Sequence, residues 1–358
     1  MDSEESAAAE ISERATLVER FMIELLITLV RVRDYTILLK IWRRRENLSL
    51  RTPFLDKVAG CASQFLLIAN FICNILGMQT YLIHLDDSQI LEVVTEGDPR
   101  DSAIVLHHGA LGSSENMAPL FRAAGDRGYF AIGITRPGYA ASTRREGRRA
   151  HDYYFETQKA IEYFQVKQFV SLGWSSGGPA AISDLQDGRC KGAVTIAGDA
   201  PRISEDWDTY IQKYPPKNGS LEDFEFPPLE DFRTCKPDQI VHLLGEGLSR
   251  KDTEICTGEF RSDLSHAMNH GLASGDFGAL DDFESDASPW GIDLEKMMKQ
   301  VAVFQGDEDR LCTPAHGYFL AEKLGNAELF LESGEGHISL MYNKSSRIIE
   351  KAIDFLNQ

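Results

Sequence analysis

The sequence has no excess of basic residues and no closely spaced cysteines, and each absence argues against a class of protein. Among 358 residues, 37 are Lys or Arg and 55 are Asp or Glu, which gives a formal net charge of −18. A nucleic-acid-binding protein has to neutralise phosphates, so we expect no nucleic-acid partner. The six cysteines lie far apart, without a Cys-x-x-Cys pair or metal-ligand spacing, which indicates reduced thiols in a reducing compartment.

The chain also lacks the start of an export signal. Such a signal begins with positive charge followed directly by an apolar run, whereas this chain opens with Met-Asp-Ser-Glu-Glu and stays acidic and alanine-rich up to Glu13. We therefore expect a cytoplasmic protein that is not secreted. Hydrophobic residues make up 43% and charged residues 26%, which is the composition of an ordinary globular protein.

Residues 1–79 predict a helical extension ahead of the main domain. Apolar residues occupy a wide helical arc over 17–42, and three arginines follow at 43–45. No charged residue occurs over 58–85, a length that could span a membrane, although polar residues interrupt the run. The extension is therefore interpreted as helices that pack on the main domain or form a homodimer, as a membrane-surface anchor, or as a span.

From residue 80 onward, short β-branched runs alternate with longer helical segments. This order predicts a doubly wound α/β fold, and the continuous apolar runs are typical of parallel strands covered on both faces. The expected strands cover 81–85, 90–95, 103–107, 129–134, 169–173, 192–196, 301–304 and 329–331. The expected helices cover 116–127, 152–164, 177–187, 315–324 and 345–357.

One interval, 199–289, contains no convincing strand. It holds 20 acidic and 8 basic residues, so it carries −12 of the net charge of −18. A loop of that length without structure of its own is improbable in a compact domain. We therefore predict an inserted helical cap over 199–289, and a core domain made of 80–198 and 290–358.

The strongest chemical signal is Gly173-Trp174-Ser175-Ser176-Gly177, at the junction of a predicted strand and a predicted helix. A Gly-x-Ser-x-Gly sequence in that context is typical of a nucleophile elbow, in which the serine hydroxyl projects from the end of the sheet. The bulky Trp174 argues against a frame centred on Ser176. We therefore predict Ser175 as a catalytic nucleophile.

A serine nucleophile needs a base and an orienting acid, and both follow in the order Ser, Asp, His. The loop after strand 301–304 offers three carboxylates, Asp307, Glu308 and Asp309, and His337 is the only one of nine histidines that follows the last predicted strand. Its glycine neighbours suggest a loop with freedom to lean over the sheet edge.

Acyl transfer also needs hydrogen-bond donors for the developing oxyanion. We predict that the amides of Ser176 and Ala110 have this role. Ser176 directly follows the nucleophile, and Ala110 follows His107-His108-Gly109 in the loop after an earlier predicted strand. His108, Gly109 and Trp174 are expected to contact substrate. The histidine pairs at 107–108 and 266–270 lack the third ligand of a catalytic zinc site, so we expect no metal.

These segments resemble the α/β-hydrolase superfamily, and more closely its α/β-fold hydrolases with a helical cap. The resemblance covers the chain from about residue 81 to its end and implies an α/β-hydrolase fold with a mostly parallel eight-stranded sheet. It also implies Asp309 as the acid, three residues after the strand-end Gly306. The matching segments are His107-His108-Gly109, Thr135-Arg136-Pro137-Gly138-Tyr139, Gly173-Trp174-Ser175-Ser176-Gly177-Gly178-Pro179, Thr195-Ile196-Ala197-Gly198, Pro289-Trp290-Gly291-Ile292-Asp293, Gly306-Asp307-Glu308-Asp309 and Gly334-Glu335-Gly336-His337. Ser176 departs from the subgroup, which often has glycine there.

The expected activity is hydrolysis of a carboxylic ester or lactone of a small to medium, fairly apolar molecule, with no cofactor. Aromatic residues of the segment 199–289 are candidates for the lining of an apolar pocket. Two alternatives stay open: the same triad could cleave an amide or a carbon–carbon bond, or the fold could serve a non-catalytic ligand-binding protein, since fold alone does not decide function.

Overall fold

The computed structural model describes residues 78–358 apart from 87, 216, 218–226 and 259. The expectations about the helices of residues 1–77, and about their membrane or dimer contacts, lie outside the described residues. In the described part of the chain, no helix has both the length and the apolar character that crossing a bilayer would require.

Eight strands form one sheet in the order β1-β2-β4-β3-β5-β6-β7-β8. Strand β2 pairs antiparallel with β1 and with β4, and all other neighbours are parallel. This arrangement confirms the predicted mostly parallel, eight-stranded sheet. The strands are β1 (Met78–His84), β2 (Ile90–Glu96), β3 (Ser102–His107), β4 (Phe130–Ile134), β5 (Gln168–Trp174), β6 (Cys190–Ile196), β7 (Gln300–Gly306) and β8 (Ala327–Glu332).

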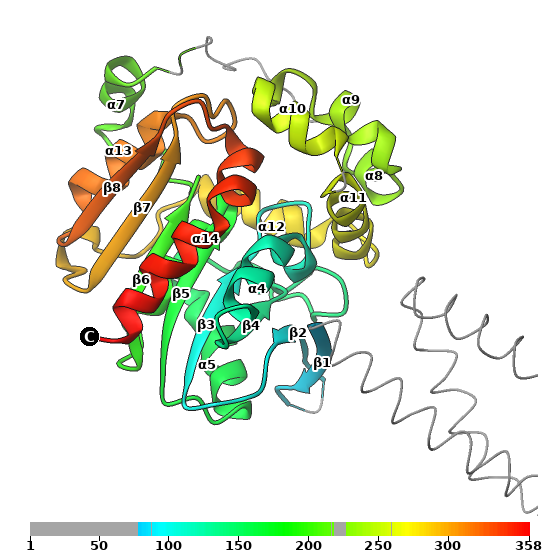
Figure 1. Ribbon diagram of the computed structural model, residues 1–358, viewed down its shortest axis with the longest axis vertical. Helices are drawn as coiled ribbons and strands as arrows, with labels where there is room; N and C mark the ends of the chain where they lie inside the picture. The colour runs from blue at the N-terminus through cyan, green and yellow to red at the C-terminus, as the bar shows by residue number, and fades with distance from the viewer. Residues whose placement is uncertain (1–77, 87, 216, 218–226, 259) are drawn as a thin grey trace, which may run out of the picture. The chain divides into compact units, whose positions relative to one another are not determined.

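Helices cover both faces of the sheet, which explains why its strands read as continuous apolar runs. Figure 1 shows α4 (Ala118–Gly125) and α14 (His337–Leu356) across one face. The opposite face packs against α5 (Tyr154–Tyr163), α6 (Gly178–Ser183) and α13 (Pro314–Lys323). Alternate residues of β3 enter the two cores, with Ile104 in the first and Val105 in the second.

Residues 199–289, which we call the inserted segment, connect β6 to β7 and contain no strand among their described residues. Figure 1 places α8 to α11 together on one side, while α7 lies beside α13. The helices of the inserted segment are α7 (Trp207–Lys213), α8 (Leu229–Arg233), α9 (Ile240–Leu244), α10 (Arg250–Thr257), α11 (Phe260–Gly271) and α12 (Phe277–Asp286).

A buried ion-pair cluster joins α12 to the core. Asp282 is fully buried and accepts hydrogen bonds from Arg136 Nη2 at 2.6 Å, Arg148 Nη1 at 2.5 Å and Tyr139 Oη at 2.7 Å. Burial alone would raise the pKa of Asp282, but the two guanidinium groups hold it well below its ordinary value. The carboxylate is therefore the shared counterion of two arginines that are themselves buried.

We predict that Asp282→Asn lowers the free energy of unfolding by about 3–5 kcal/mol, because it leaves two buried cations without their counterion. Urea unfolding at neutral pH measures this change. The control is Glu284→Gln on the same helix, which loses only a surface pair with Arg149 and should change stability by less than about 1 kcal/mol. Equal losses in the two variants would contradict the role given to Asp282.

Candidate active site

The turn after β5 holds Ser175 in a conformation that few non-glycine residues adopt. Ser175 has a φ of 56°, it begins the short helix η3 (Ser175–Gly177), and α6 follows directly. The glycines beside it are required by space: a Cβ on Gly173 would lie 2.0 Å from the Gly177 oxygen, and one on Gly177 would lie 2.3 Å from the His107 oxygen. The backbone therefore makes the tight strand-to-helix turn expected of a nucleophile elbow.

The loop after β7 brings one of its three carboxylates to His337. Asp309 Oδ2 lies 2.9 Å from His337 Nδ1, while Asp309 Oδ1 accepts the amides of Leu311 and Cys312, each at 2.9 Å. Asp307 instead pairs with Lys217 and accepts the Gly334 amide. The acid that contacts the histidine is therefore Asp309.

His337 is buried and lies at the start of a helix. It is the first residue of α14, it is 5% exposed, and its carbonyl accepts a hydrogen bond from Trp174 Nε1 at 3.0 Å. The sequence predicts that His337 lies in a loop and that the last helix begins at residue 345, and this prediction is wrong, because α14 begins at His337. The helix begins eight residues earlier because the carboxylate of Asp252 binds the amides of its first turn.

Burial and the neighbouring charges have opposite effects on the pKa values of His337 and Asp309. Burial would lower the pKa of His337, but the carboxylates of Asp309, Asp252 and Asp199 raise it above its ordinary value. Burial raises the pKa of Asp309, while the contact with His337 and the Leu311 amide act against that rise. The carboxylates around the imidazole thus favour its protonated form.

The two loops predicted to supply amides lie against each other. A Cβ on Gly109 would lie 3.2 Å from Ser175 Cβ, which places the loop after β3 beside the elbow. The amide of the next residue, Ala110, has no hydrogen-bond partner among the described residues. Arg136 connects the two loops, because its guanidinium donates to the His108 carbonyl and, at 3.0 Å, to Ser176 Oγ.

Two of the expected substrate contacts have other partners. His108 is fully buried, its Nδ1 is 2.7 Å from the Gly109 oxygen, and its Nε2 accepts the Arg136 amide at 3.0 Å. Burial, together with the charge of Arg136, lowers the pKa of His108 well below its ordinary value, so the ring is neutral. Trp174 packs on His337 with ring centroids 5.5 Å apart. Both side chains contact neighbouring segments of the fold, and a Cβ on the third residue, Gly109, would lie 3.2 Å from Ser175 Cβ.

The sequence reasoning missed three residues that shape this site. The motif around Arg136 assigns this arginine no role of its own, and the acids Asp252 and Asp282 contribute only to the net charge of the segment in which they lie. Arg136 could have been noticed as an arginine in an otherwise apolar stretch at the end of a buried strand. Asp252 does carry a local signal, since Ser249 and Asp252 have the spacing of a capping box, but that signal predicts only the start of α10. The contacts of Asp252 with α14 and those of Asp282 with Arg136 join segments that are far apart in the chain.

Asp199, Cys312 and His316 form a buried group with metal-ligand chemistry. Their ligand atoms have partners within the fold: Cys312 Sγ lies 3.4 Å from Asp199 Oδ1, and His316 Nδ1 accepts the Ala200 amide at 2.9 Å. Burial raises the pKa of the Cys312 thiol well above its ordinary value. In this arrangement the group acts as a hydrogen-bonded support beside the loop of Asp309. Cys190, Cys235 and Cys256, like Cys312, are free and buried.

Residues 102–344 match the family model described as alpha/beta hydrolase fold. Solved structures with the same fold include a bromoperoxidase from Bacillus anthracis, 18% identical, with a TM-score of 0.59 over 78% of this chain and all of the other. An esterase from Exiguobacterium antarcticum is 15% identical, with a TM-score of 0.58 over 78% of this chain and 100% of the other. An esterase from a Rhodococcus species is 16% identical, with a TM-score of 0.56 over 78% and 98%. No curated protein sequence gives a significant match.

We predict that Gly177→Ala lowers the free energy of unfolding by about 1–3 kcal/mol, because the Cβ of the alanine would overlap the backbone at His107. Thermal and urea unfolding measure the change. Gly188→Ala is the matched control, since a Cβ there meets nothing within 4 Å, and its stability should stay within about 0.5 kcal/mol of wild type. A Gly177→Ala protein as stable as the control would disprove the close approach at the elbow.

Proposed function

Because this chain belongs to the alpha/beta hydrolase fold family, we propose that it is a serine hydrolase that cleaves a carboxylic ester or lactone through an acyl-enzyme on Ser175. The observation that carries the proposal is the contact between Asp309 and His337 next to the strained turn of Ser175. Trp174, the residue before Ser175, bonds to His337, so the base and the nucleophile belong to adjoining segments.

The proposed reaction has two stages. Ser175 Oγ attacks the carbonyl carbon while His337 Nε2 takes the hydroxyl proton, and His337 then gives that proton to the leaving alcohol as the acyl C–O bond breaks. Water repeats the attack on the acyl-enzyme and releases the acid. Asp309 keeps the proton on His337 Nδ1, so that Nε2 is free to act as the base. Each step uses only these side chains and water.

The negative charge on the former carbonyl oxygen needs donors that are already in place. In our proposal these are the amides of Ala110 and Ser176. Two observations support this assignment: the Ala110 amide has no hydrogen-bond partner in the described part of the chain, and Gly109 lies so close to Ser175 that an added Cβ would be 3.2 Å from Ser175 Cβ. The link from Arg136 to both loops would keep the two amides at a fixed separation.

The substrate is proposed to be small to medium in size and fairly apolar, and the inserted segment is proposed to act as a cap over the site. Esterases among the structural relatives support the ester class. The aromatic residues of the inserted segment give less support, since Phe232 and Phe260 lie in the core and Phe277 is exposed against Arg144. A panel of ester, lactone, amide and diketone substrates would distinguish the bond types that one triad can cleave.

We predict that Ser175→Ala lowers kcat for p-nitrophenyl acyl esters by at least about 1,000-fold, because the nucleophile is lost. Stopped-time assays of purified wild type and variant measure this loss, and circular dichroism checks that both are folded. Ser113→Ala is the control, because it removes a buried hydroxyl that has no partner among the described residues, and it should retain activity. Comparable turnover by Ser175→Ala and wild type would reject the proposed nucleophile.

The pH dependence of the wild type tests the proposed base. The pKa of His337 is raised, and the imidazole must be neutral to accept the proton of Ser175. Activity should therefore be low when pH is below this pKa and should rise through it, with the acid limb of kcat/KM above the ordinary histidine value of about 6.5. A limb near pH 4–5 would indicate a carboxylate base and contradict the assignment.

A further inference from the structure

The first turn of α14 is held by a carboxylate from a distant part of the chain. Asp252 of α10 is fully buried, and its Oδ1 accepts the amides of Ile338 at 2.9 Å and Ser339 at 2.7 Å. Its Oδ2 accepts the amide of His337 at 3.1 Å and that of Ser249 at 3.0 Å. One side chain thus binds three consecutive amides that start at the proposed base.

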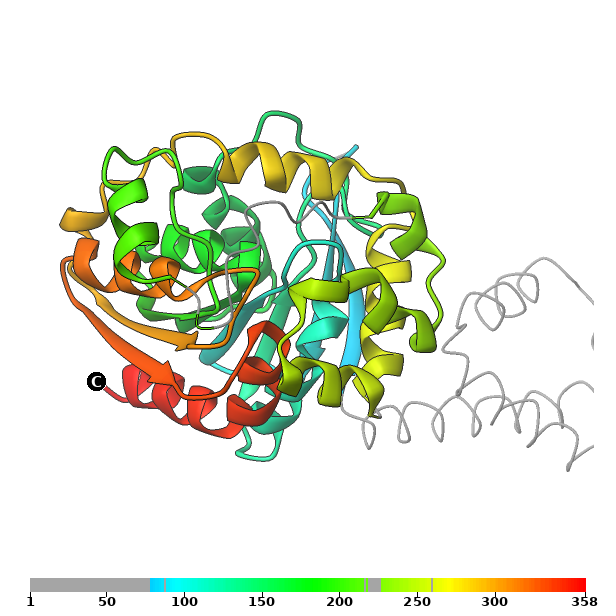
Figure 2. The ribbon, with the colours of Figure 1, turned by 90° about the horizontal axis from the view of Figure 1, so that it is seen from above.

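Those amides need an acceptor that their own segment does not provide. The first amides of a helix have no partner within the helix, and the residue before α14 is Gly336, which has no side chain to cap it. A Cβ on Gly336 would lie 2.1 Å from Asp252 Oδ2, so the glycine is what lets the carboxylate approach. A second contact, Lys251 Nζ to Glu335 Oε1 at 2.8 Å, joins the same two segments. Figures 1 and 2 show the start of α14 beside α10.

We propose that Asp252 is a positioning residue for His337: by binding the amides of residues 337–339, it fixes the backbone that carries the base and places a negative charge beside the imidazole. This inference rests on the proposed serine-hydrolase function. It links α10 to the position of His337, because a movement of α10 away from α14 would release the backbone that Asp252 holds.

The charge of Asp252 acts on His337 together with other groups that face the ring. These are Asp309 in the loop after β7, Asp199 after β6, and His316 on α13. Burial lowers the pKa of His337, and Asp309 and Asp252 both raise it. Removal of one negative charge should therefore lower the pKa of the imidazole, and the acid limb of the pH profile should move to lower pH.

The test compares Asp252→Asn with wild type in the full-length chain, using p-nitrophenyl acyl esters. We expect kcat to fall at least tenfold while KM changes less than twofold, and we expect the acid limb of kcat/KM to move down by at least half a pH unit. Wild-type turnover that depends on Ser175 is the prerequisite. If that turnover is missing, the proposed function fails, whereas an unchanged Asp252→Asn enzyme rejects this inference alone.

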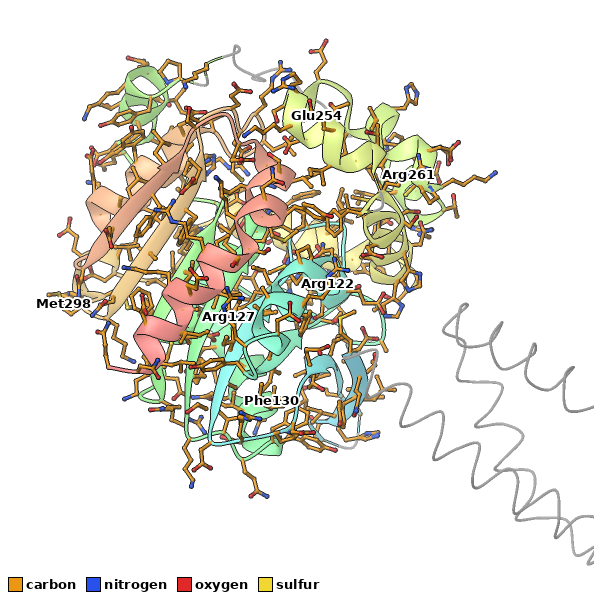
Figure 3. All side chains as sticks on the ribbon, viewed as in Figure 1. Arg122, Arg127, Phe130, Glu254, Arg261 and Met298 are labelled. Atoms are coloured by element: carbon orange, nitrogen blue, oxygen red, sulfur yellow. The ribbon has the colours of Figure 1, made fainter. Side chains whose placement is uncertain are left out.

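Two controls separate positioning from helix stability and from general charge. Thr257 lies at the exposed end of α10, and its hydroxyl donates to the carbonyls of Thr253 and Glu254 within the same helix. Thr257→Gly therefore weakens α10 but leaves Asp252 and its contacts with α14 in place. Glu254→Gln removes one charge from the same helix at the exposed surface shown in Figure 3. Both controls should keep kcat within twofold and the acid limb within 0.2 pH unit, as order-of-magnitude limits. Equal effects in Thr257→Gly and Asp252→Asn would overturn the proposal.

If Asp252→Asn does not fold, Asp252→Glu replaces it. The longer side chain keeps the charge but cannot hold its oxygens where the three amides converge. We expect kcat to fall at least fivefold while the acid limb stays at its wild-type position. A wild-type kcat in Asp252→Glu would show that the close fit to α14 does not matter, and would also overturn the proposal.

Discussion

The hydrogen bond between the buried carboxylate of Asp309 and Nδ1 of His337 is the interaction on which the proposed chemistry of this site depends. A buried carboxylate is costly unless it is paired and hydrogen-bonded, and Asp309 meets that condition through the imidazole and the amides of Leu311 and Cys312. Asp309 follows the end of β7, and His337 begins α14. The two residues meet because both segments reach the same edge of the sheet. The parallel sheet therefore brings together groups that are far apart in sequence.

The inserted segment contributes to this edge through two buried aspartates. Asp282 neutralises Arg136, which in turn contacts the two loops beside Ser175. Asp252 binds the helix start at His337. The acidic character of the segment is thus not only a solvated surface, because two of its acids are counterions or caps inside the molecule. Ser176, which departs from the glycine often found in the subgroup, has a role in the same network as the acceptor for Arg136.

The sequence predicted those features that depend on neighbours in the chain. Period and composition identified the eight strands, and the glycines around Ser175 identified the turn, because both reflect local backbone constraints. The start of α14 was predicted too late, since the cap for its first amides comes from Asp252, 85 residues away from His337. Likewise, the sequence does not reveal that both ring nitrogens of His108 bond within the fold, and its contact with substrate stays a prediction. Long-range polar contacts of this kind leave no periodic signal in the sequence.

A crystal structure of the protein after treatment with an alkyl fluorophosphonate would show which side chain reacts and which groups surround it. We expect a covalent bond from Ser175 Oγ to phosphorus, with the phosphoryl oxygen about 3 Å from the amides of Ala110 and Ser176, and with His337 Nε2 within hydrogen-bond distance of Ser175 Oγ. An adduct on another residue, or a phosphoryl oxygen that points away from both amides, would contradict the proposed mechanism.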